Sequence, residues 1–294
     1  MDFEYSREPA DAKYVGFLLN GGRLGNQLFH LITGYGIARA LGRIHYLPFN
    51  RDLQPHVQRY LSDFKKVFPR LTETYVLGPE KLNVTAIPFG GSCCTYDNPI
   101  RLVNNSDKYI LLNFIYGQNP RFFDEYLGDV RQFLTFSRSI RDEGDYAIDS
   151  LKIKRNSWMC IHIRRTDFIE RNISTDVNLT VNAANSIAKL TNVSHFLLFG
   201  DDQTFMKDLA NKIIEHGKWQ KDATMVSKYN EYMDLYLSSQ LCRSFLISAP
   251  TSTFGWWLAF FIPDQNAVYY TMDDRKHGDK IVTKELFMKS WQQI

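Results

Sequence analysis

The stretch YVGFLLNGGRLGNQLFHLITGYGIARALGR, residues 14–43, indicates the class of fold. It begins with a short apolar run that stops at glycines, which is typical of a buried strand. From Leu28 to Leu41 apolar residues recur every three or four positions, the spacing of a helix, and Gly42 follows as a stop signal. Strand, glycine turn and helix in this order predict the start of an α/β layer.

The second half of the chain alternates between strand-like and helix-like segments. Strands are expected at 157–163, 195–200 and 244–248, and helices at 180–190, 204–216, 230–241 and 254–261. Such alternation predicts a parallel, doubly wound sheet. Ligands of such sheets bind beyond the carboxyl ends of the strands.

The first half is less regular. A strand is expected at 108–117, followed by a helix over 120–134 that opens with proline. The stretch 137–156 is charged and poor in large apolar groups, so it predicts a boundary between domains. We therefore expect two domains, over 1–145 and 146–294.

Composition and charge exclude several classes of protein. The 294 residues are 44% hydrophobic and 23% charged, which is too apolar for a disordered chain. The net charge of +3 and the lack of a basic run argue against nucleic acid as a partner. The uncharged run Ser244–Ile262 approaches the length of a membrane span, but Pro250 and the nearby hydroxyl residues favour a strand, a loop and a helix.

Cysteine and asparagine patterns bear on the cellular compartment. Four cysteines occur without the spacing of a zinc site. Residues 1–17 contain acidic side chains and no apolar core, so we expect neither a signal peptide nor a membrane anchor there. A secretory lumen is favoured by five N-x-S/T sequons, which begin at Asn83, Asn104, Asn172, Asn178 and Asn192.

Two adjacent arginines follow an expected strand in the segment HIRRTD, residues 162–167. Side chains alternate along a strand, so His162 and Arg164 face one side, and Arg165 can turn into the crevice. Paired guanidinium groups suit a phosphate or pyrophosphate, which accepts forked hydrogen bonds. Asp167 could orient an arginine or accept a proton. The alternative is a structural Arg–Asp pair beside a buried histidine.

The segment GGRLGNQ, residues 21–27, occupies the first turn from strand to helix. Its glycines let the backbone approach a ligand, and the N–H groups of a helix start attract anions. It matches neither the Walker A pattern nor the dinucleotide-binding pattern. The alternative is a plain tight turn with Asn26 as the N-cap.

Two further polar clusters follow strands. The segment APTST, residues 249–253, precedes a helix, so its hydroxyls and the helix N–H groups could form a second anion site. The segment FGDD, residues 199–202, offers Asp201 or Asp202 to a base or a ribose hydroxyl. For both clusters the alternative is an ordinary helix cap.

Patterns typical of other chemistries do not occur in the sequence. It has no D-x-D triple of the kind that holds a cation against a diphosphate, so arginines and helix ends are expected to neutralise any diphosphate that binds. It also has no G-x-S-x-G elbow that would indicate a hydrolase.

Together these segments resemble the α-1,2-fucosyltransferases of glycosyltransferase family 11. The matching segments, in chain order, are GGRLGNQLFHLITGYGIARALG, HIRRTDF, LFGDDQTFMK and STFGWWLAFF, and NFIYGQNPRFF is a looser match. They span residues 21–261, so the resemblance covers most of the chain. The sequence departs from the family pattern at Thr166, where glycine is usual.

The resemblance implies a GT-B-like α/β fold, in which two Rossmann-type domains with parallel sheets face each other across a cleft. It implies GDP-fucose as the donor, inversion at the anomeric carbon, and no metal or other cofactor. The first domain would lie on the acceptor side and the second would bind the donor. The implied acceptor is a galactose-terminated glycan. The implied location is the Golgi lumen, with membrane attachment through an N-terminal anchor absent from this chain.

Carried over residue by residue, the resemblance implies two sets of site residues. In the catalytic set, Arg164 and Arg165 stabilise charge on the leaving diphosphate. Asp167 and His162 are the candidates for taking the proton of the acceptor hydroxyl. The donor-binding set is Gly22, Arg23, Gly25, Asn26, Asp201, Asp202, Ser252, Thr253 and Phe254.

Two alternatives stay open from the sequence. One is a glycan-binding protein without turnover, for which Thr166 is the only support. The other is a transferase of the protein O-fucosyltransferase type, which shares a G-R-x-G-N-Q turn.

Overall fold

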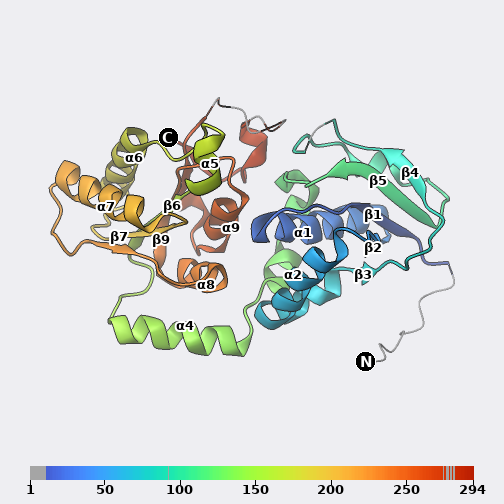
Figure 1. Ribbon diagram of the computed structural model, residues 1–294, viewed down its shortest axis with the longest axis horizontal. Helices are drawn as coiled ribbons and strands as arrows, with labels where there is room; N and C mark the ends of the chain where they lie inside the picture. Colours follow the sequence, from blue (N-terminus) through green and yellow to red (C-terminus); the bar gives the residue numbers. More distant parts are fainter. Residues whose placement is uncertain (1–10, 92, 274, 276–277, 279, 281) are drawn as a thin grey trace. The chain divides into compact units, whose positions relative to one another are not determined.

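The computed structural model describes residues 11–91, 93–273, 275, 278, 280 and 282–294. The chain divides into two compact units, Met1–Thr135 and Phe136–Ile294 (Figure 1). Each unit contains one parallel sheet with helices, so the predicted α/β class is confirmed. Residues 1–10, which form most of the segment in which no anchor is expected, lie outside the described residues.

The first unit is built on a five-stranded parallel sheet in the order β3-β2-β1-β5-β4. This order reverses direction between β1 and β5. Its strands are β1 Tyr14–Leu18, β2 Ile44–Leu47, β3 Val76–Leu77, β4 Thr85–Pro88 and β5 Tyr109–Ile115, and its helices are α1 Leu24–Leu41, α2 Gln54–Val67 and α3 Leu127–Phe133.

Helix α1 confirms one sequence prediction and corrects another. It ends as predicted, because Gly42 adopts the left-handed conformation (φ 62°) and its N–H reaches the carbonyls of Ala38 and Arg39. It begins earlier than predicted, with Arg23 at the N-cap position. Asn26 is therefore not the N-cap but a residue of the first helical turn, and its Oδ1 accepts a hydrogen bond from Gln118.

The helix predicted over 120–134 is broken into three short pieces. Two 3₁₀ turns, Pro120–Phe122 and Asp124–Tyr126, precede α3. Phe123 separates the two turns with non-helical dihedrals (φ −141°) and is fully buried. Burial of this aromatic ring takes precedence over helical continuity.

The second unit has a six-stranded parallel sheet in the order β11-β10-β9-β6-β7-β8. The strands and helices predicted for this half are all present, within a few residues of the expected bounds. The strands are β6 Trp158–Ile163, β7 Phe196–Gly200, β8 Thr224–Val226, β9 Cys242–Ile247, β10 Val268–Tyr270 and β11 Gln292–Gln293. The helices are α4 Arg138–Leu151, α5 Thr166–Glu170, α6 Val177–Leu190, α7 Gln203–Gly217, α8 Glu231–Leu241 and α9 Thr253–Phe261.

The charged stretch that predicted the domain boundary is helix α4, which belongs to the second unit. Gly144 packs so closely on α8 that an added Cβ would lie 2.1 Å from the ring of Tyr236. The hydroxyl of Tyr236 donates to Asp145 at 2.5 Å. The units divide at 135/136, whereas the predicted boundary at 145/146 falls inside α4.

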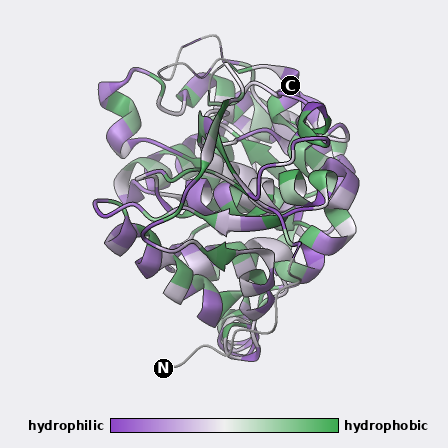
Figure 2. Cartoon of the chain, turned by 90° about the vertical axis from the view of Figure 1, so that its right-hand side faces the viewer, coloured by the Kyte–Doolittle hydropathy of each residue, from purple (hydrophilic) through white to green (hydrophobic). Residues whose placement is uncertain are grey.

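Strands β6 and β7 consist almost wholly of buried residues, and Figure 2 colours hydrophobic residues green and hydrophilic residues purple along the chain. The run Ser244–Ile262 forms the end of β9, a loop and α9, as predicted. In the part of the chain that the structure describes, no helix combines the length and apolarity needed to cross a membrane.

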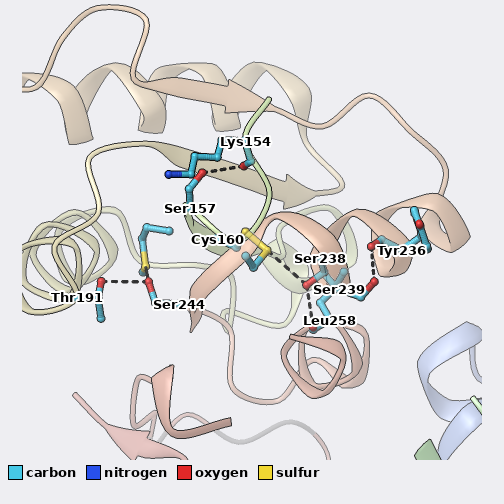
Figure 3. The surroundings of a disulfide bond; sticks show 11 residues. Lys154, Ser157, Cys160, Thr191, Tyr236, Ser238, Ser239, Ser244 and Leu258 are labelled. Carbon is cyan, nitrogen blue, oxygen red and sulfur yellow. Dashed lines mark hydrogen bonds between the residues drawn. A yellow bond between two sulfur atoms is a disulfide. The ribbon is translucent and has the colours of Figure 1, made fainter. Parts of the chain in front are cut away.

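Two disulfides use the four cysteines. Cys160 in β6 is bonded to Cys242 at the start of β9, and both are fully buried in the core of the second unit (Figure 3). The Cys242 sulfur lies 3.6 Å from the Oγ of Ser238, which donates to the Leu258 carbonyl. The other disulfide joins the adjacent residues Cys93 and Cys94 in the first unit.

We expect the Cys160–Cys242 disulfide to stabilise the second unit strongly, because it links residues 82 positions apart. In the chain-entropy account, closing a loop of this length contributes about 4 kcal/mol. The double variant Cys160→Ala/Cys242→Ala should therefore lose roughly that free energy of unfolding in urea titrations. Cys93→Ala/Cys94→Ala is the matched control, because a bond between neighbours closes almost no loop. Equal losses in the two variants would contradict the prediction.

Buried histidines should make the protein unstable in acid. Burial lowers the pKa of His45 to about 4 and of His162 to about 3, and it lowers the pKa of His30 well below its ordinary value. The unfolded chain takes up protons below pH ~6.5, whereas the folded chain does not. Stability is therefore present above that pH and falls as pH drops toward the folded-state values, by about 1.4 kcal/mol per pH unit and histidine.

The measurement is the free energy of unfolding between pH 7 and pH 5. His30 stacks on Phe17 at 3.9 Å between ring centroids, and both its ring nitrogens are buried without a hydrogen bond to any described residue. His30→Leu should reduce the change of the unfolding free energy with pH by about 1.4 kcal/mol per pH unit, which is the contribution of one histidine. The exposed His216→Leu is the control. An unchanged slope in His30→Leu would show that His30 does not resist protonation.

Candidate functional site

Three polar clusters of the second unit meet at the carboxyl edge of its sheet. The parallel register pairs Ile163 of β6 with Gly200 of β7, and His162 of β6 with Ile247 of β9. The segments that follow these strands therefore lie side by side, as the sequence predicted. The strand order reverses between β6 and β9, and doubly wound sheets bind ligands at this kind of switch point.

Arg164 follows β6 and is held by two carboxylates. Its Nη1 lies 2.9 Å from Asp201 Oδ2, and its Nη2 lies 2.6 Å from Asp167 Oδ1. Its guanidinium also lies over the ring of Phe168, at 5.3 Å from the centroid. The side chain is only 12% exposed, whereas that of Asp167 is 46% exposed. An anion that reaches Arg164 would therefore compete with the accessible Asp167.

Arg165 is more accessible and less fully bonded. Its guanidinium stacks over Phe205 at 4.1 Å and its side chain is 27% exposed. The Nε atom lies 3.4 Å from Asp202 Oδ2, yet it makes no hydrogen bond within the described part of the chain. A buried guanidinium N–H without an acceptor is costly, and an anionic ligand would supply one.

Asp201 organises the loop that carries both arginines. Its Oδ1 accepts the backbone N–H of Arg165 at 2.9 Å, and its Oδ2 accepts Thr166 Oγ1 at 2.6 Å as well as Arg164. Burial acts to raise the pKa of Asp201, but the hydrogen bond from Thr166 and the charge of Arg164 outweigh it and hold the pKa below its ordinary value. Both oxygens are thus engaged inside the protein, which suits a positioning role better than the expected contact with a base or ribose.

Asp202 serves as a helix cap, which was the alternative interpretation of this cluster in the sequence. It is the N-cap of α7, where its Oδ1 accepts the N–H of Phe205 at 3.0 Å. Its other oxygen faces Arg165. Asp202 therefore joins the start of α7 to the arginine loop.

His162 lies inside the unit and cannot serve as a surface base. The ring is 1% exposed, and an added Cβ on Gly255 of α9 would lie 2.4 Å from its Nδ1. Burial, reinforced by the charge of Arg164, lowers its pKa to about 3. The expected role of His162 in taking the acceptor proton is therefore not supported, because a neutral, enclosed ring cannot reach a hydroxyl in solvent. Asp167 is the accessible candidate.

The loop after β9 places Ser252, Thr253 and Phe254 at the start of α9. Ser252 occupies the N-cap position, yet its hydroxyl makes no cap hydrogen bond in the described part of α9 and lies 3.5 Å from His162 Nε2. The ordinary cap interpretation therefore does not describe this hydroxyl. Thr253 and Phe254 begin the helix and are partly exposed, and the ring of Phe254 meets the edge of His162.

The GGRLGNQ turn lies in the first unit, after β1. Gln27 fastens it by donating to Asn20 and to the Gly22 carbonyl, both at 2.9 Å. Arg23 is exposed and Gly25 is buried. Asn26 is partly exposed, and its Oδ1 accepts a hydrogen bond from Gln118.

Three polar residues near the ends of these strands gave no local signal in the sequence. Thr175 accepts the backbone N–H of Arg164 at 3.0 Å and contacts the Oγ of Ser248 at 3.0 Å, so the loop after α5 braces the arginine. Lys280 donates to the Thr251 carbonyl at 3.0 Å, and burial lowers its pKa to about 7. Asp234 in α8 accepts the Ser227 hydroxyl, and burial raises its pKa to about 7. Only the fold brings these groups to the sheet edge.

The chain was compared with known proteins and structures. The family model for Glycosyl transferase family 11 matches residues 106–294, more than half of the chain. A galactoside 2-alpha-L-fucosyltransferase of Caenorhabditis elegans is 27% identical over 92% of this chain and 76% of its own length. A second protein of that organism, provisionally given the same name, is 29% identical over 92% of this chain and 74% of its own length.

Among solved structures, that of POFUT1 in complex with GDP has a TM-score of 0.50 at 10% sequence identity, covering 86% of this chain and 95% of that chain. This likeness concerns the fold and confirms the predicted GT-B-like class. The sequence motifs, the match to the family model and the similarity to the relatives all indicate the same family. The chain therefore belongs to glycosyltransferase family 11 and is a fucosyltransferase, as its motifs predicted.

Proposed function

We propose that this protein transfers L-fucose from GDP-β-L-fucose to the 2-hydroxyl of a terminal galactoside, with inversion and without a metal ion. The observation that carries the proposal is the arginine pair at the switch point of the second sheet, where Arg165 Nε lies 3.4 Å from Asp202 but makes no hydrogen bond to any residue that the structure describes. A pyrophosphate offers acceptors that two planar guanidinium groups can share. The names of the curated relatives favour a galactoside as the acceptor.

In this proposal the acceptor oxygen attacks C1 of fucose while the bond from C1 to the β-phosphate oxygen breaks. The electron pair of that bond leaves with GDP, so negative charge grows on the β-phosphate. Arg164 and Arg165 stabilise this charge, with the N–H groups at the start of α9 and the hydroxyls of Ser252 and Thr253 as further donors. The acceptor hydroxyl must also lose its proton, and Asp167, once the diphosphate displaces it from Arg164, is the accessible carboxylate that could take this proton. Attack opposite the leaving group converts the β-linked donor into an α-linked product.

Thr166 bears on the alternative of a binding protein without turnover. The residue replaces a glycine that is usual in the family, but its hydroxyl donates to Asp201 and helps to hold the arginine loop. The substitution is thus accommodated by a specific contact. This supports a catalytic protein.

The disulfides bear on location. Both pairs of cysteines are bonded, and disulfides persist in oxidising compartments such as the secretory pathway. With the five sequons, this supports the proposal that the protein acts in the Golgi lumen. Attachment to the membrane through a segment outside this chain stays part of that proposal.

Arginine 165 should be essential for transfer but not for folding. We expect Arg165→Ala to lower kcat by about 10²–10³-fold, because a fixed donor to the leaving phosphate is lost. Arg165→Lys should fail similarly, since a point charge cannot form the forked contact. Transfer assays with GDP-fucose would measure kcat for both variants. Calorimetry with GDP in the presence of a chelator would test whether the donor binds without a metal ion. The exposed Arg243→Ala is the control. Near-normal turnover in Arg165→Ala would refute the assignment, and loss of GDP binding with the chelator would refute metal independence.

Asp167 should separate catalysis from donor binding. Asp167→Asn cannot take a proton, so we expect kcat to fall about 10²-fold. The Kd for GDP should stay unchanged or decrease, because Arg164 loses its exposed carboxylate competitor. Glu170→Gln is the matched control, since Glu170 is also exposed on α5. If instead kcat holds and GDP binding weakens, Asp167 orients Arg164 and another group takes the proton.

A further inference from the structure

A surface groove of the second unit lies between helices α6 and α7. Its volume is about 530 Å³. Val177 and Val181 of α6 contribute apolar side chains to its lining, and the other lining residues are polar. None of these residues belongs to the arginine site at the sheet edge. The groove is therefore a separate feature of this unit, which the proposed reaction does not use.

The polar side chains of the groove do not pair with one another. Asn178 and Asn182 come from α6, and Lys212, Glu215 and His216 come from α7. All five are exposed, and none makes a side-chain hydrogen bond or an ion pair with a residue that the structure describes. They offer amide, ammonium, carboxylate and imidazole groups, which can donate to hydroxyls or accept from them. Such a lining, with two valines beside it, suits the hydroxyl groups and C–H faces of sugars.

One wall of the groove carries an N-x-S/T sequon. The sequon is Asn178-Leu179-Thr180, in the first turn of α6. Asn178 is exposed, whereas Thr180 is 1% exposed and its hydroxyl donates to the Asp176 carbonyl. Attachment of a glycan to a sequon requires the hydroxyl of its third residue. Modification of Asn178 would therefore precede the folding of α6.

We propose that Asn178 carries an N-linked glycan whose first sugars lie in the groove between α6 and α7. The inference rests on the proposed location in the secretory pathway. In the modifying step, Asn178 Nδ2 forms a bond to C1 of an N-acetylglucosamine and gives up one proton. The bond from C1 to the diphosphate of a lipid-linked oligosaccharide breaks, and the lipid diphosphate leaves with the electron pair.

The covalent link allows weak contacts to hold the glycan in the groove. The first sugar is attached to a side chain that lines the groove, so its effective concentration there is high. Its hydroxyls can reach Lys212 and Glu215 on the other wall. Farther along α6, Asn185 already joins the two helices by donating to the Ile213 carbonyl at 3.3 Å and accepting from Trp219 Nε1 at 2.6 Å. The glycan would add a second connection, nearer the start of α6.

Occupancy of the site and contact with the groove can be measured separately. The protein should be expressed in insect cells behind a secretion signal, so that the test does not depend on its natural location. Mass spectrometry should find N-acetylglucosamine on the peptide that contains Asn178, and Asn178→Gln should lose one glycan. The control is Asn104→Gln, which removes an exposed sequon asparagine of the first unit.

Amide hydrogen exchange reports contact with the groove. Exchange in α6 and in 212–216 should be about threefold slower in the glycosylated protein than in Asn178→Gln. Enzymatic removal of the glycan from the folded protein should give the same increase in exchange, which covers a variant that folds poorly. Lys212→Ala/Glu215→Ala should keep the glycan and lose the slower exchange. Asn104→Gln should leave exchange in both helices unchanged.

The inference and the proposed function fail separately. Asn178 without sugar in the secreted protein would overturn the inference. A glycan that leaves exchange in 212–216 unchanged would also overturn it, because the sugars would then extend into solvent. Fucose transfer by the same samples tests the function, and Asn178→Gln should keep kcat within about twofold of wild type, since Asn178 lies outside the arginine site. If Asn178 is occupied and the groove is protected but no fucose is transferred, only the proposed function fails.

Discussion

The parallel register of β6 with β7 and β9 is the constraint on which the second-unit site depends. It pairs Ile163 with Gly200, so the next residues of the two strands, Arg164 and Asp201, must meet. Both strands are buried on both faces, and buried apolar strands resist a slip by one residue, because it would exchange the side chains on the two faces. The core thus fixes the geometry of polar groups that lie outside it.

Three carboxylates at this edge of the sheet balance the positive charge of the two adjacent arginines. Asp167, Asp201 and Asp202 face Arg164 and Arg165. Asp201 is engaged on both oxygens by the loop, whereas Asp167 is the most exposed of the three. An incoming anion would therefore displace Asp167 and leave the Asp201 contacts intact. The carboxylate released in this way would be available for another task beside the same site.

The sequence predicted what depends on local pattern. Hydrophobic spacing placed the strands and helices of the second unit, and polar residues after strand ends marked the site, since the end of a strand is a local property. It could not show that His162 is enclosed by Gly255, which lies on a helix 93 positions later in the chain. Nor could it pair Gln118 with Asn26, 92 residues away. Burial and long-range hydrogen bonds depend on which elements become neighbours in space.

The two units share one arrangement of residues at the ends of neighbouring strands, although the residue types differ. In each, the group expected to meet the ligand follows one strand, and the group that fixes it follows the neighbouring parallel strand. In the second unit, Asp201 after β7 holds the backbone of Arg165 after β6. In the first, Gln118 after β5 holds the amide of Asn26 after β1. Parallel neighbours deliver their carboxyl ends to one edge, so a rigid sheet can orient donors before a charge develops, which is when preorganised donors are most effective.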